Sequence, residues 1–448
     1  MRHRLPATSL EVVKAPNFAY WLRMQLALTS AKLFGFWDHP RPNATEEAEE
    51  YTFVDEAYAN YKYLRPLTQA EKNVREIVFK NNSSIVRLPG GFQKKASLTI
   101  GAAGDLMPAE GLEHSKDIMF EKISDVLLDV DISFANLEGP VTEQKVEVKF
   151  TGGETAPIMG FTVSEFDTLA GHKGKNFTAL SFANNHTFDR GLEGLETTQR
   201  IFSQYGIADI GTPKSPEDYG RAKIFVVRGI KVGFIAATFS LNGLQLPKGE
   251  THRVHMTRLS SREVPADLGL LRKQIDDCKA QDCDFIVASI HWGYDFEFFP
   301  RQKQIDAAHT LVEEGVDLIL GHHPHVIQPV EYYRTNRDTN RVAVIAYSLG
   351  GLGFRWYTAP HYALGLILNI TLTKGAVDNA VRTYVESIAV IPVFQDILVS
   401  YNGDRKIKRL EKLQDQLNQD GTRHFARYLS KVKMYADLVL GPQNTRID

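Results

Sequence analysis

The sequence is poor in cysteine, carries almost no net charge and lacks any long uninterrupted apolar run. Only two of its 448 residues are cysteine, and the C-x4-C spacing of Cys278 and Cys283 fits neither a redox CxxC pair nor a common zinc-finger spacing. We therefore expect two unpaired thiols. This is compatible with a reducing compartment, and we predict a cytoplasmic location. The 52 basic and 54 acidic side chains leave a net charge of −2, which excludes a broad electrostatic footprint for nucleic acid.

The N-terminal stretch is apolar but does not resemble a secretion signal or a membrane span. Arg23 and Lys32 interrupt it, so the unbroken apolar core of a signal peptide is missing and no bilayer-spanning length remains. We expect a soluble protein. Apolar side chains recur there at roughly helical spacing, at Phe18, Leu22, Leu26, Leu28 and Leu33. This pattern predicts an amphipathic helix that docks on the protein itself, with a membrane-surface or partner-binding helix as the alternative.

Three regions of the chain differ in pattern. Residues 1–95 contain few strand-like runs and are predicted to form a helical N-terminal extension, which could gate a site or dock a partner. The Pro-Gly-Gly loop within 81–95 is the best boundary signal. Residues 96–395 are predicted to form the main domain. Residues 396–448 return to charged helical patterns and are predicted to form a C-terminal helical segment.

The main domain alternates short apolar runs with amphipathic helical patterns. Strand-like runs include 97–105, 283–293 and 316–325, and 222–238 is predicted to be a hairpin that turns near Arg228-Gly229. Strand, helix and strand in succession predict an α/β fold. The later run of strands predicts a mixed sheet or a second sheet.

Polar side chains cluster where the predicted strands end. In α/β sheets, ligands bind outside the carboxyl ends of the strands, so these side chains are expected to meet. The candidates, in chain order, are Asp105, Asn136, Glu138, Asn184, Asn185, His186, His291, His322, His323 and His325. Five strand ends that deliver aspartate, glutamate, asparagine and histidine predict a metal site.

The segment GHHPH is the sharpest of these signals. Residues two apart in an extended segment point to the same side, so His323 and His325 can present two imidazoles to one ion, with Pro324 stiffening the link. His322 would point the other way, toward a substrate. Imidazole with carboxylate suits Zn, Fe, Mn or Ni, whereas oxygen-rich sites favour Mn, Mg or Ca.

Each of these elements also has a structural alternative. Asp105 could cap the following segment, Asn136 and Glu138 could hold a turn, and Asn184-Asn185 could form an ordinary turn. Asp189 is predicted to cap the helix that starts at Arg190. Trp292 is expected in the core, and Asp295 and Glu297 are either solvated loop charges or part of the site.

Six sequence blocks together resemble the CapA family of poly-γ-glutamate capsule biosynthesis, which is related to the calcineurin-like metallophosphoesterases. The blocks occur in the family's order between about residues 97 and 393. They are GDLM (104–107), ANLEGPV (135–141), ANNHTFDRG (183–191), IHWGYDFE (290–297), GHHPHVIQPVE (321–331) and AYSLGG (346–351). The resemblance implies a bacterial protein whose fold is a sandwich of two mixed β-sheets flanked by helices, with metal at the strand ends.

The resemblance also implies roles for single residues. Asp105 matches the family's first aspartate, but Met107 stands where metallophosphoesterases carry a histidine, and Gly351 stands where many CapA-like sequences carry asparagine. Asn136 or Glu138 takes the place of the bridging carboxylate. The usual N-terminal membrane anchor is not found. The expected metal ligands are Asp105, Asn136, Glu138, Asn185, His291, His323 and His325, and the expected catalytic groups are His186 and His322.

Three functions remain open from the sequence. The first is metal-dependent hydrolysis of a phosphoester or of an amide in a poly-γ-glutamate-type polymer, with one or two divalent ions (Mn, Zn, Fe or Ca). In the second, an ion acidifies a peptide α-proton, and His186 and His322 epimerise the residue as acid and base. The third is non-enzymatic binding of an anionic polymer, or assembly of a complex.

Overall fold

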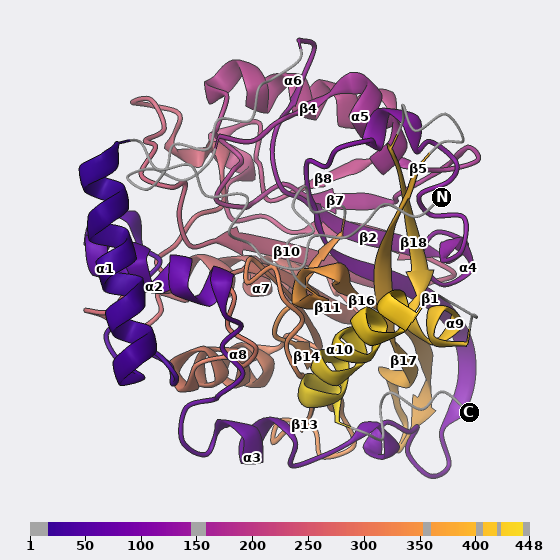
Figure 1. Ribbon diagram of the computed structural model, residues 1–448. Helices are drawn as coiled ribbons and strands as arrows, with labels where there is room; N and C mark the ends of the chain where they lie inside the picture. The colour runs from indigo at the N-terminus through magenta and orange to yellow at the C-terminus, as the bar shows by residue number, and fades with distance from the viewer. Residues whose placement is uncertain (1–16, 145–157, 353–359, 400–405, 419–422, 442–448) are drawn as a thin grey trace.

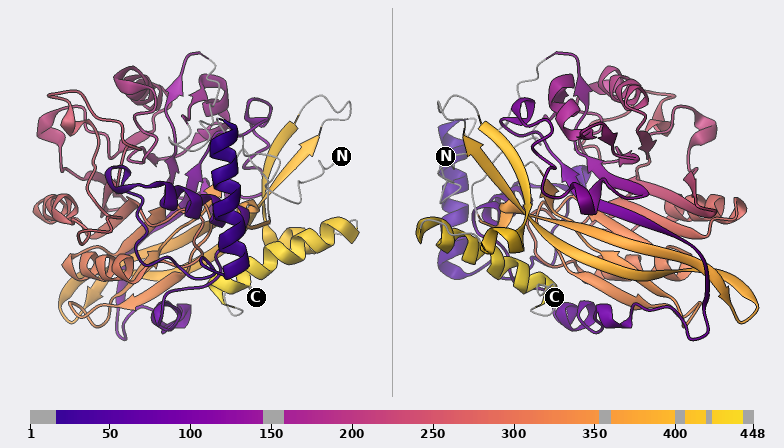
Figure 2. Two further views of the ribbon diagram at one scale, coloured as in Figure 1. Left: turned by 60° about the vertical axis from the view of Figure 1, so that its left-hand side comes forward. Right: turned by 90° about the vertical axis from the view of Figure 1, so that its right-hand side faces the viewer.

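In the computed structural model, two β-sheets pack face to face, and helices cover their outer faces (Figures 1 and 2). The structure describes residues 17–144, 158–352, 360–399, 406–418 and 423–441. Both sheets are mixed, and each contains parallel and antiparallel strand pairs. The predicted α/β sandwich of two mixed sheets is confirmed.

The first sheet is divided by its central strand β1 into a parallel half and an antiparallel half. β2, β7 and β8 run parallel on one side of β1, and β16, β17 and β18 run antiparallel on the other. The short β15 also pairs with β1. In spatial order the strands are β18 (Lys406–Lys412), β17 (Ala380–Val399), β16 (Leu364–Val377), β1 (Gln93–Leu106), β2 (Ile132–Leu137), β7 (Ala179–Ser181) and β8 (Ala208–Ile210), with β15 at Gly351–Leu352.

The second sheet has four parallel strands between two antiparallel edges. In spatial order its strands are β13 (Val330–Arg334), β14 (Val342–Ala346), β12 (Leu318–His322), β11 (Phe285–His291), β10 (Ile230–Thr238) and β9 (Lys223–Val227). β9 and β10 form the predicted hairpin, and both Arg228 and Gly229 at its turn have positive φ. Two small ladders lie apart, one formed by β3 (Val141–Thr142) and β4 (Phe161–Thr162), the other by β5 (Gly171–His172) and β6 (Lys175–Asn176).

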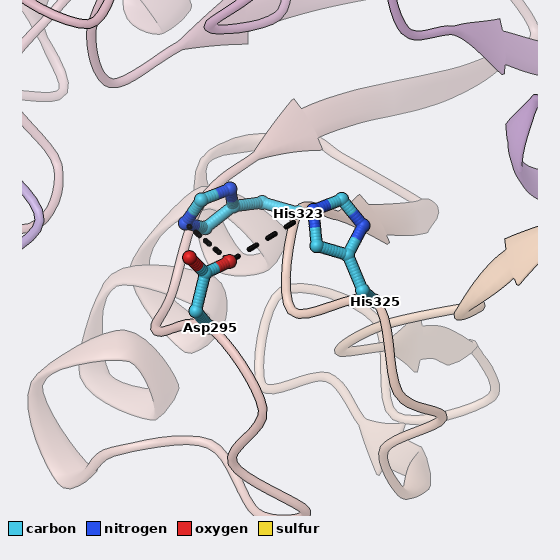
Figure 3. A group of neighbouring side chains, drawn as sticks. All are labelled: Asp295, His323 and His325. Carbon is cyan, nitrogen blue, oxygen red and sulfur yellow. Dashed lines mark ion pairs between the residues drawn. The ribbon is translucent and has the colours of Figure 1, made fainter. Parts of the chain in front are cut away.

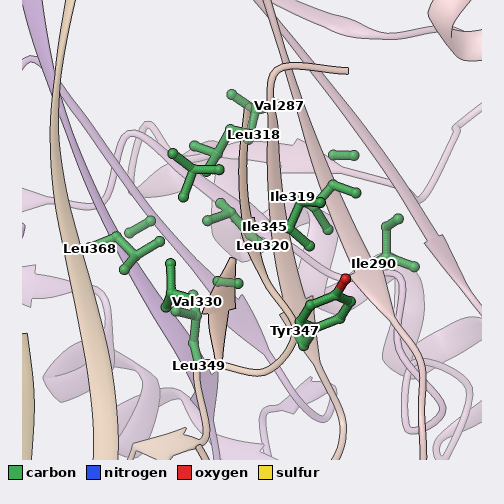
Figure 4. Packing of buried hydrophobic residues seen from close by; sticks show 14 of the residues in the cluster. Val287, Ile290, Leu318, Ile319, Leu320, Val330, Ile345, Tyr347, Leu349 and Leu368 are labelled. Atoms are coloured by element: carbon green, nitrogen blue, oxygen red, sulfur yellow. The ribbon is translucent and has the colours of Figure 1, made fainter. Parts of the chain in front are cut away.

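One hydrophobic core fills the space between the two sheets. β11 and β12 are buried along their whole length, which explains their nearly continuous apolar sequences. Phe134 of β2 stacks on Phe234 of β10, with ring centroids 5.3 Å apart, and so links the sheets directly. Leu368 of β16 packs in the same cluster as Leu320 of β12 (Figure 4). A second core lies between the first sheet and α5 and α6, where Phe166 stacks on Phe202.

Helices surround the sandwich, and the N-terminal ones lie to one side of it (Figure 1). The helices are α1 (Phe18–Phe34), α2 (Phe53–Leu64), α3 (Val74–Val78), α4 (Ser124–Leu127), α5 (Val163–Leu169), α6 (Gly191–Gln204), α7 (Gly269–Ala280), α8 (Gln302–Glu314), α9 (Leu413–Leu417) and α10 (Arg423–Leu440). Within the described part of the chain, no helix combines the length and apolarity that crossing a bilayer requires.

α1 is the predicted N-terminal helix, and only one of its faces is packed. Met24 and Ala31 are buried in a small core shared with Tyr58 and Tyr61 of α2. The other face exposes large apolar side chains, among them Phe18 and Leu33, each 73% exposed. α1 therefore docks on the protein, but not through the predicted apolar residues, of which Phe18, Leu22, Leu26 and Leu33 are exposed. A partner for this outer face stays a prediction.

The helical prediction for 396–448 is wrong in one stretch. β17 continues to Val399, and Lys406–Lys412 form the edge strand β18 instead of a helix. In that stretch Lys408 and Leu410 are both buried, and the backbone forms hydrogen bonds to β17. Tertiary pairing outweighed the helical propensity of a charged sequence. The division into three domains stays a prediction.

Two glycines allow backbone segments to approach closely at the ends of the parallel strands. A Cβ at Gly321 in β12 would lie 1.9 Å from the carbonyl oxygen of Tyr347, and one at Gly104 in β1 would lie 1.9 Å from that of Gly350. Both glycines immediately precede site residues. The close approach therefore sets where those strand ends lie.

We expect Gly321→Ala to lower the free energy of unfolding by about 2 kcal/mol, because the added methyl collides with backbone that has no flexible way to yield. The melting temperature should fall by several degrees in a thermal-shift assay. Gly90→Ala is the control, since a Cβ there meets nothing within 4 Å. Equal melting temperatures for both variants would contradict this account.

Candidate metal centre

The carboxyl ends of the parallel strands from both sheets meet and bring the predicted residues together. Asp105 is in β1, Asn136 in β2 with Glu138 just beyond it, and Asn185 and His186 follow β7. His291 and His322 end β11 and β12, and their Cα atoms pair across the ladder. All of these side chains are buried, although they are charged or polar. The sequence placed them correctly at one edge, and their metal-binding role stays a prediction.

His323 and His325 both face Asp295, which lies in the loop after β11 (Figure 3). His323 Nε2 is 3.5 Å and His325 Nε2 is 3.9 Å from Asp295 Oδ1. The extended geometry expected for this segment is wrong, because His323 and His325 have φ of 97° and 56°. The chain turns here because β12 ends at His322 and the His323 amide donates to Asp105 Oδ2 at 3.1 Å. The two imidazoles converge through this turn.

Glu138 lies at the centre of the cluster. Its Oε1 is 3.6 Å from His325 Nε2, 3.8 Å from His291 Nε2 and 3.9 Å from His186 Nε2. The side chain is completely buried, and neither oxygen accepts a hydrogen bond from the described residues. A buried carboxylate without donors is costly unless a cation compensates it. Glu138 is thus the strongest indication that the cluster is built to bind a cation.

Asn136 holds Asp105 in place, and its amide nitrogen also lies 3.5 Å from His291 Nδ1. Its Nδ2 donates to Asp105 Oδ1 at 2.8 Å, and its Oδ1 accepts from Asn184 Nδ2 at 3.2 Å. Asn184 Nδ2 also donates to the carbonyl oxygen of Leu137 at 2.7 Å. This chain of hydrogen bonds between the two asparagine amides orients Asp105. Of the two candidates for the bridging carboxylate, the geometry favours Glu138.

Asn185 and His291 face each other across the two sheets. Asn185 Oδ1 lies 2.8 Å from His291 Nε2, and Asn185 Nδ2 donates to Asn242 Oδ1 at 3.1 Å. The amide oxygen of Asn185 and the ring nitrogen of His291 therefore lie side by side. Both are atoms that bind divalent cations.

His186 is held by an aspartate that sequence reasoning assigned elsewhere. Asp189 Oδ2 lies 2.7 Å from His186 Nδ1 and also accepts from the Met159 amide at 2.6 Å. The predicted helix-capping role of Asp189 is wrong, because α6 begins at Gly191 after Arg190 and has no side-chain cap. A carboxylate on Nδ1 leaves Nε2 directed at Glu138. The three-residue spacing of His186 and Asp189 was the sequence signal that could have predicted this pairing.

His322 does not point away from the cluster as expected. Its Nδ1 lies 3.1 Å from Asp105 Oδ1, and its ring contacts Phe134 at a centroid distance of 6.3 Å.

Trp292 is in the core, as expected, and its indole nitrogen donates to the Tyr347 carbonyl at 3.3 Å. The solvated alternative for Glu297 is wrong, since Glu297 is buried and paired with Lys62 and Arg301.

Burial lowers the pKa of three histidines of the cluster and raises that of Glu138. Burial lowers the pKa of His323 to about 3 and that of His325 to about 4, and it also holds the pKa of His291 well below the usual value. Neutral imidazole is the form that binds metal. Burial and the nearby Asp105 raise the pKa of Glu138 well above its usual value. Burial alone would raise the pKa of Asp105, but His322 outweighs it and holds that pKa below its usual value.

Two groups of atoms in the described part of the chain could hold an ion. One consists of Asp295, His323 and His325, and the other of Asp105, Glu138 and His325, with ligand atoms in each group within 4.8 Å of one another. His325 belongs to both. Mixed imidazole and carboxylate sets suit Zn, Fe or Mn. The residues therefore fit a divalent ion, and its identity and number stay open.

Two departures from the family pattern lie in the same region. Met107 is buried against Met159, so its position offers a thioether and no imidazole. Gly351 in β15 pairs in register with Asp105, so the amide expected there would have stood directly beside the site. Asp295, a carboxylate that the sequence left open between loop and site, lies where it could supply an additional ligand atom.

We expect Glu138→Gln to raise the melting temperature of the metal-free protein at pH 7 by about 2 °C. Since the pKa of Glu138 is raised by folding, its ionised form destabilises the folded state above the unfolded pKa of about 4.3, and this penalty vanishes as the pH falls below that value. Thermal melts at pH 7 and pH 4 measure the difference. Glu113→Gln, on an exposed side chain, is the control. Destabilisation by Glu138→Gln at both pH values would contradict the assignment.

Comparisons with known proteins agree with the resemblance derived from the sequence. Residues 99–354 match the family described as bacterial capsule synthesis protein PGA_cap. The chain is 27% identical over 278 residues to capsule biosynthesis protein CapA of Bacillus anthracis, covering 59% of this chain and 62% of that protein. It is 28% identical over 264 residues to PGA biosynthesis protein CapA of Bacillus subtilis strain 168, covering 57% and 63%. The chain thus spans less than two thirds of the length of these relatives.

Solved structures with a likeness to the chain include two bacterial proteins. One is the calcineurin-like phosphoesterase YfkN from Bacillus subtilis, with a TM-score of 0.36, 15% identity and coverage of 79% of this chain and 98% of that one. The other is a putative 5'-nucleotidase from Staphylococcus aureus in complex with alpha-ketoglutarate, with a TM-score of 0.38, 13% identity and coverage of 76% and 59%. Scores of this size do not establish a fold, which rests on the two sheets themselves.

The family match extends over more than half of the 448 residues and includes every residue of the cluster from Asp105 to His325. The predicted relation to capsule-synthesis proteins is therefore confirmed, and the chain belongs to the bacterial capsule synthesis protein PGA_cap family.

Proposed function

We propose that the protein is a metal-dependent hydrolase that acts on a phosphoester or on an amide of a poly-γ-glutamate-type polymer. The observation that carries the proposal is Glu138, a buried carboxylate without hydrogen-bond donors among the described residues, ringed by the imidazoles of His186, His291 and His325. The family relation supports the polymer as a substrate class. The cytoplasmic location also remains a proposal.

The ion would be held by Asp105, Glu138, Asn185, His291, His323, His325 and Asp295. When bound, a divalent ion polarises a phosphoryl or acyl oxygen and lowers the pKa of water. The protein contributes orientation. Asn136 fixes Asp105, and Asn242 fixes the amide of Asn185 so that its oxygen faces His291.

His186 is the candidate general acid. Asp189 accepts the Nδ1 proton and so holds the ring in the tautomer and orientation in which Nε2 faces the centre of the cluster. A protonated Nε2 there can donate to a leaving-group oxygen or nitrogen. Asp189 is itself fixed by the Met159 amide, so the pair is pre-organised.

The geometry supports hydrolysis more than epimerisation. An epimerase needs an acid and a base on opposite sides of the reacting carbon, and His322 was the candidate for the second group. His322 Nδ1 lies 3.1 Å from Asp105 Oδ1, so this ring is engaged by a proposed metal ligand and does not stand opposite His186 as a second acid or base. A single general acid, His186, positioned beside a metal is typical of a hydrolase.

Metal content tests the foundation of the proposal. We expect protein purified without a histidine tag or chelators to carry Zn, Fe or Mn after reconstitution, measured by elemental mass spectrometry. The His323→Ala/His325→Ala double variant should lose at least 90% of that metal, because it removes ligands from both groups. His309→Ala, a histidine paired with Glu331 outside the cluster, is the control. Retention of metal by the double variant would contradict the site.

His186→Gln tests the acid separately from the metal. The variant should keep its metal and lose about 10²- to 10⁴-fold in kcat on a phosphodiester or γ-glutamyl amide panel. Asp189→Asn should reduce kcat less, since the ring keeps a hydrogen-bond partner. Unchanged turnover in His186→Gln would remove this histidine from the mechanism. Racemised peptide without cleavage would instead favour the epimerase.

A further inference from the structure

The loop that carries Asp295 is enclosed by the N-terminal segment, here defined as residues 41–71. Tyr294 packs in the small core formed with Tyr58 and Tyr61 of α2, and its hydroxyl donates to the Ala44 carbonyl at 3.3 Å. Leu67 forms a backbone bridge with Glu297. The N-terminal segment thus covers the residues on both sides of Asp295.

Glu46 contacts the loop at Asp295 itself. The Asp295 amide donates to Glu46 Oε1 at 3.3 Å, and the Glu46 side chain is only 8% exposed. This contact fixes the backbone from which the Asp295 carboxylate projects toward His323 and His325. No local sequence pattern connects positions 46 and 295.

Lys62 binds a second residue of the loop, Glu297. Its ammonium is fully buried, 3.1 Å from Glu297 Oε1 and 3.8 Å from Glu46 Oε1. Arg301 donates to both oxygens of Glu297, at 2.6 and 2.8 Å, and also pairs with Glu71 at 2.8 Å. Taking these charges out of water costs several kcal/mol per ion, which only good mutual geometry offsets. The network therefore holds the loop in one arrangement.

The loop needs such support because its backbone is strained. Phe296, next to Asp295, has a φ of 61°, which is unfavourable for a bulky side chain. Its ring packs 5.3 Å from Tyr63 of α2, and its amide donates to the Pro324 carbonyl at 2.9 Å. The strained turn is thus held between the N-terminal segment and the segment that carries His323 and His325.

We propose that the N-terminal segment is a constituent of the metal centre, in which Glu46 and Lys62 are positioning residues that hold Asp295 against His323 and His325. The inference rests on the proposed metal-dependent function. It gives the extension a role in building the site, in place of gating it.

A Co²⁺ titration of the full chain tests the proposal, with visible absorption and isothermal calorimetry as readouts. Glu46→Ala and Lys62→Met should each raise the Kd for Co²⁺ by about 10- to 100-fold, the range for residues that orient metal ligands. Glu46→Gln should stay within about threefold of wild type, because its amide oxygen still accepts from the Asp295 amide. Arg258→Ala is the matched control, since Arg258 pairs with Glu50 of the same segment away from the loop.

A double-mutant cycle separates positioning from general stability. Asp295→Asn alone should weaken Co²⁺ binding by a similar factor, and Glu46→Ala should add nothing to it, because both changes remove the same ligand. Additive losses, or wild-type binding by a folded Glu46→Ala variant, would overturn the inference. If Lys62→Met fails to fold, the comparison of Glu46→Ala with Glu46→Gln and the double-mutant cycle still test the inference. No Co²⁺ binding by the wild type would instead overturn the proposed function.

Discussion

The structure depends on a local excess of buried negative charge. Glu138 has no hydrogen-bond donor among the described residues, and Asp105, Asp189 and Asp295 are near enough to raise its pKa. Burial lowers the pKa of His291, His323 and His325, so these three imidazoles do not compensate the charge at neutral pH. In the function proposed here, a divalent cation would make this arrangement favourable, and the other features of the site would hold its ligands.

The fold delivers those ligands from both sheets. Parallel strands bring Asp105, Glu138 and Asn185 from the first sheet to the same edge as His291 and His323 from the second. The core between the sheets fixes their separation, as in the stacked Phe134 and Phe234. Because no single element contains the site, its geometry depends on how the sheets pack, and changes in that core should reach the ligands.

Much of this could be predicted from the sequence, and the remainder could not for physical reasons. Strand ends are marked by local patterns, so the α/β class, the hairpin at Arg228-Gly229 and the polar residues at the strand ends were accessible. β18 was missed because its charged sequence becomes a strand only through pairing with β17. The contacts of Glu46 with Asp295 and of Lys62 with Glu297 join chain segments more than 200 residues apart, and no local pattern encodes such a meeting.

The most direct measurement is anomalous diffraction from crystals grown with Mn²⁺ or Zn²⁺, recorded on either side of the metal absorption edge. The account predicts an anomalous peak about 2.0–2.3 Å from His325 and from carboxylate oxygens of Glu138 or Asp295. A second peak would show that both ligand groups are occupied. Crystals that diffract well and show no metal peak in this cluster, or show one only elsewhere on the protein, would contradict the central claim.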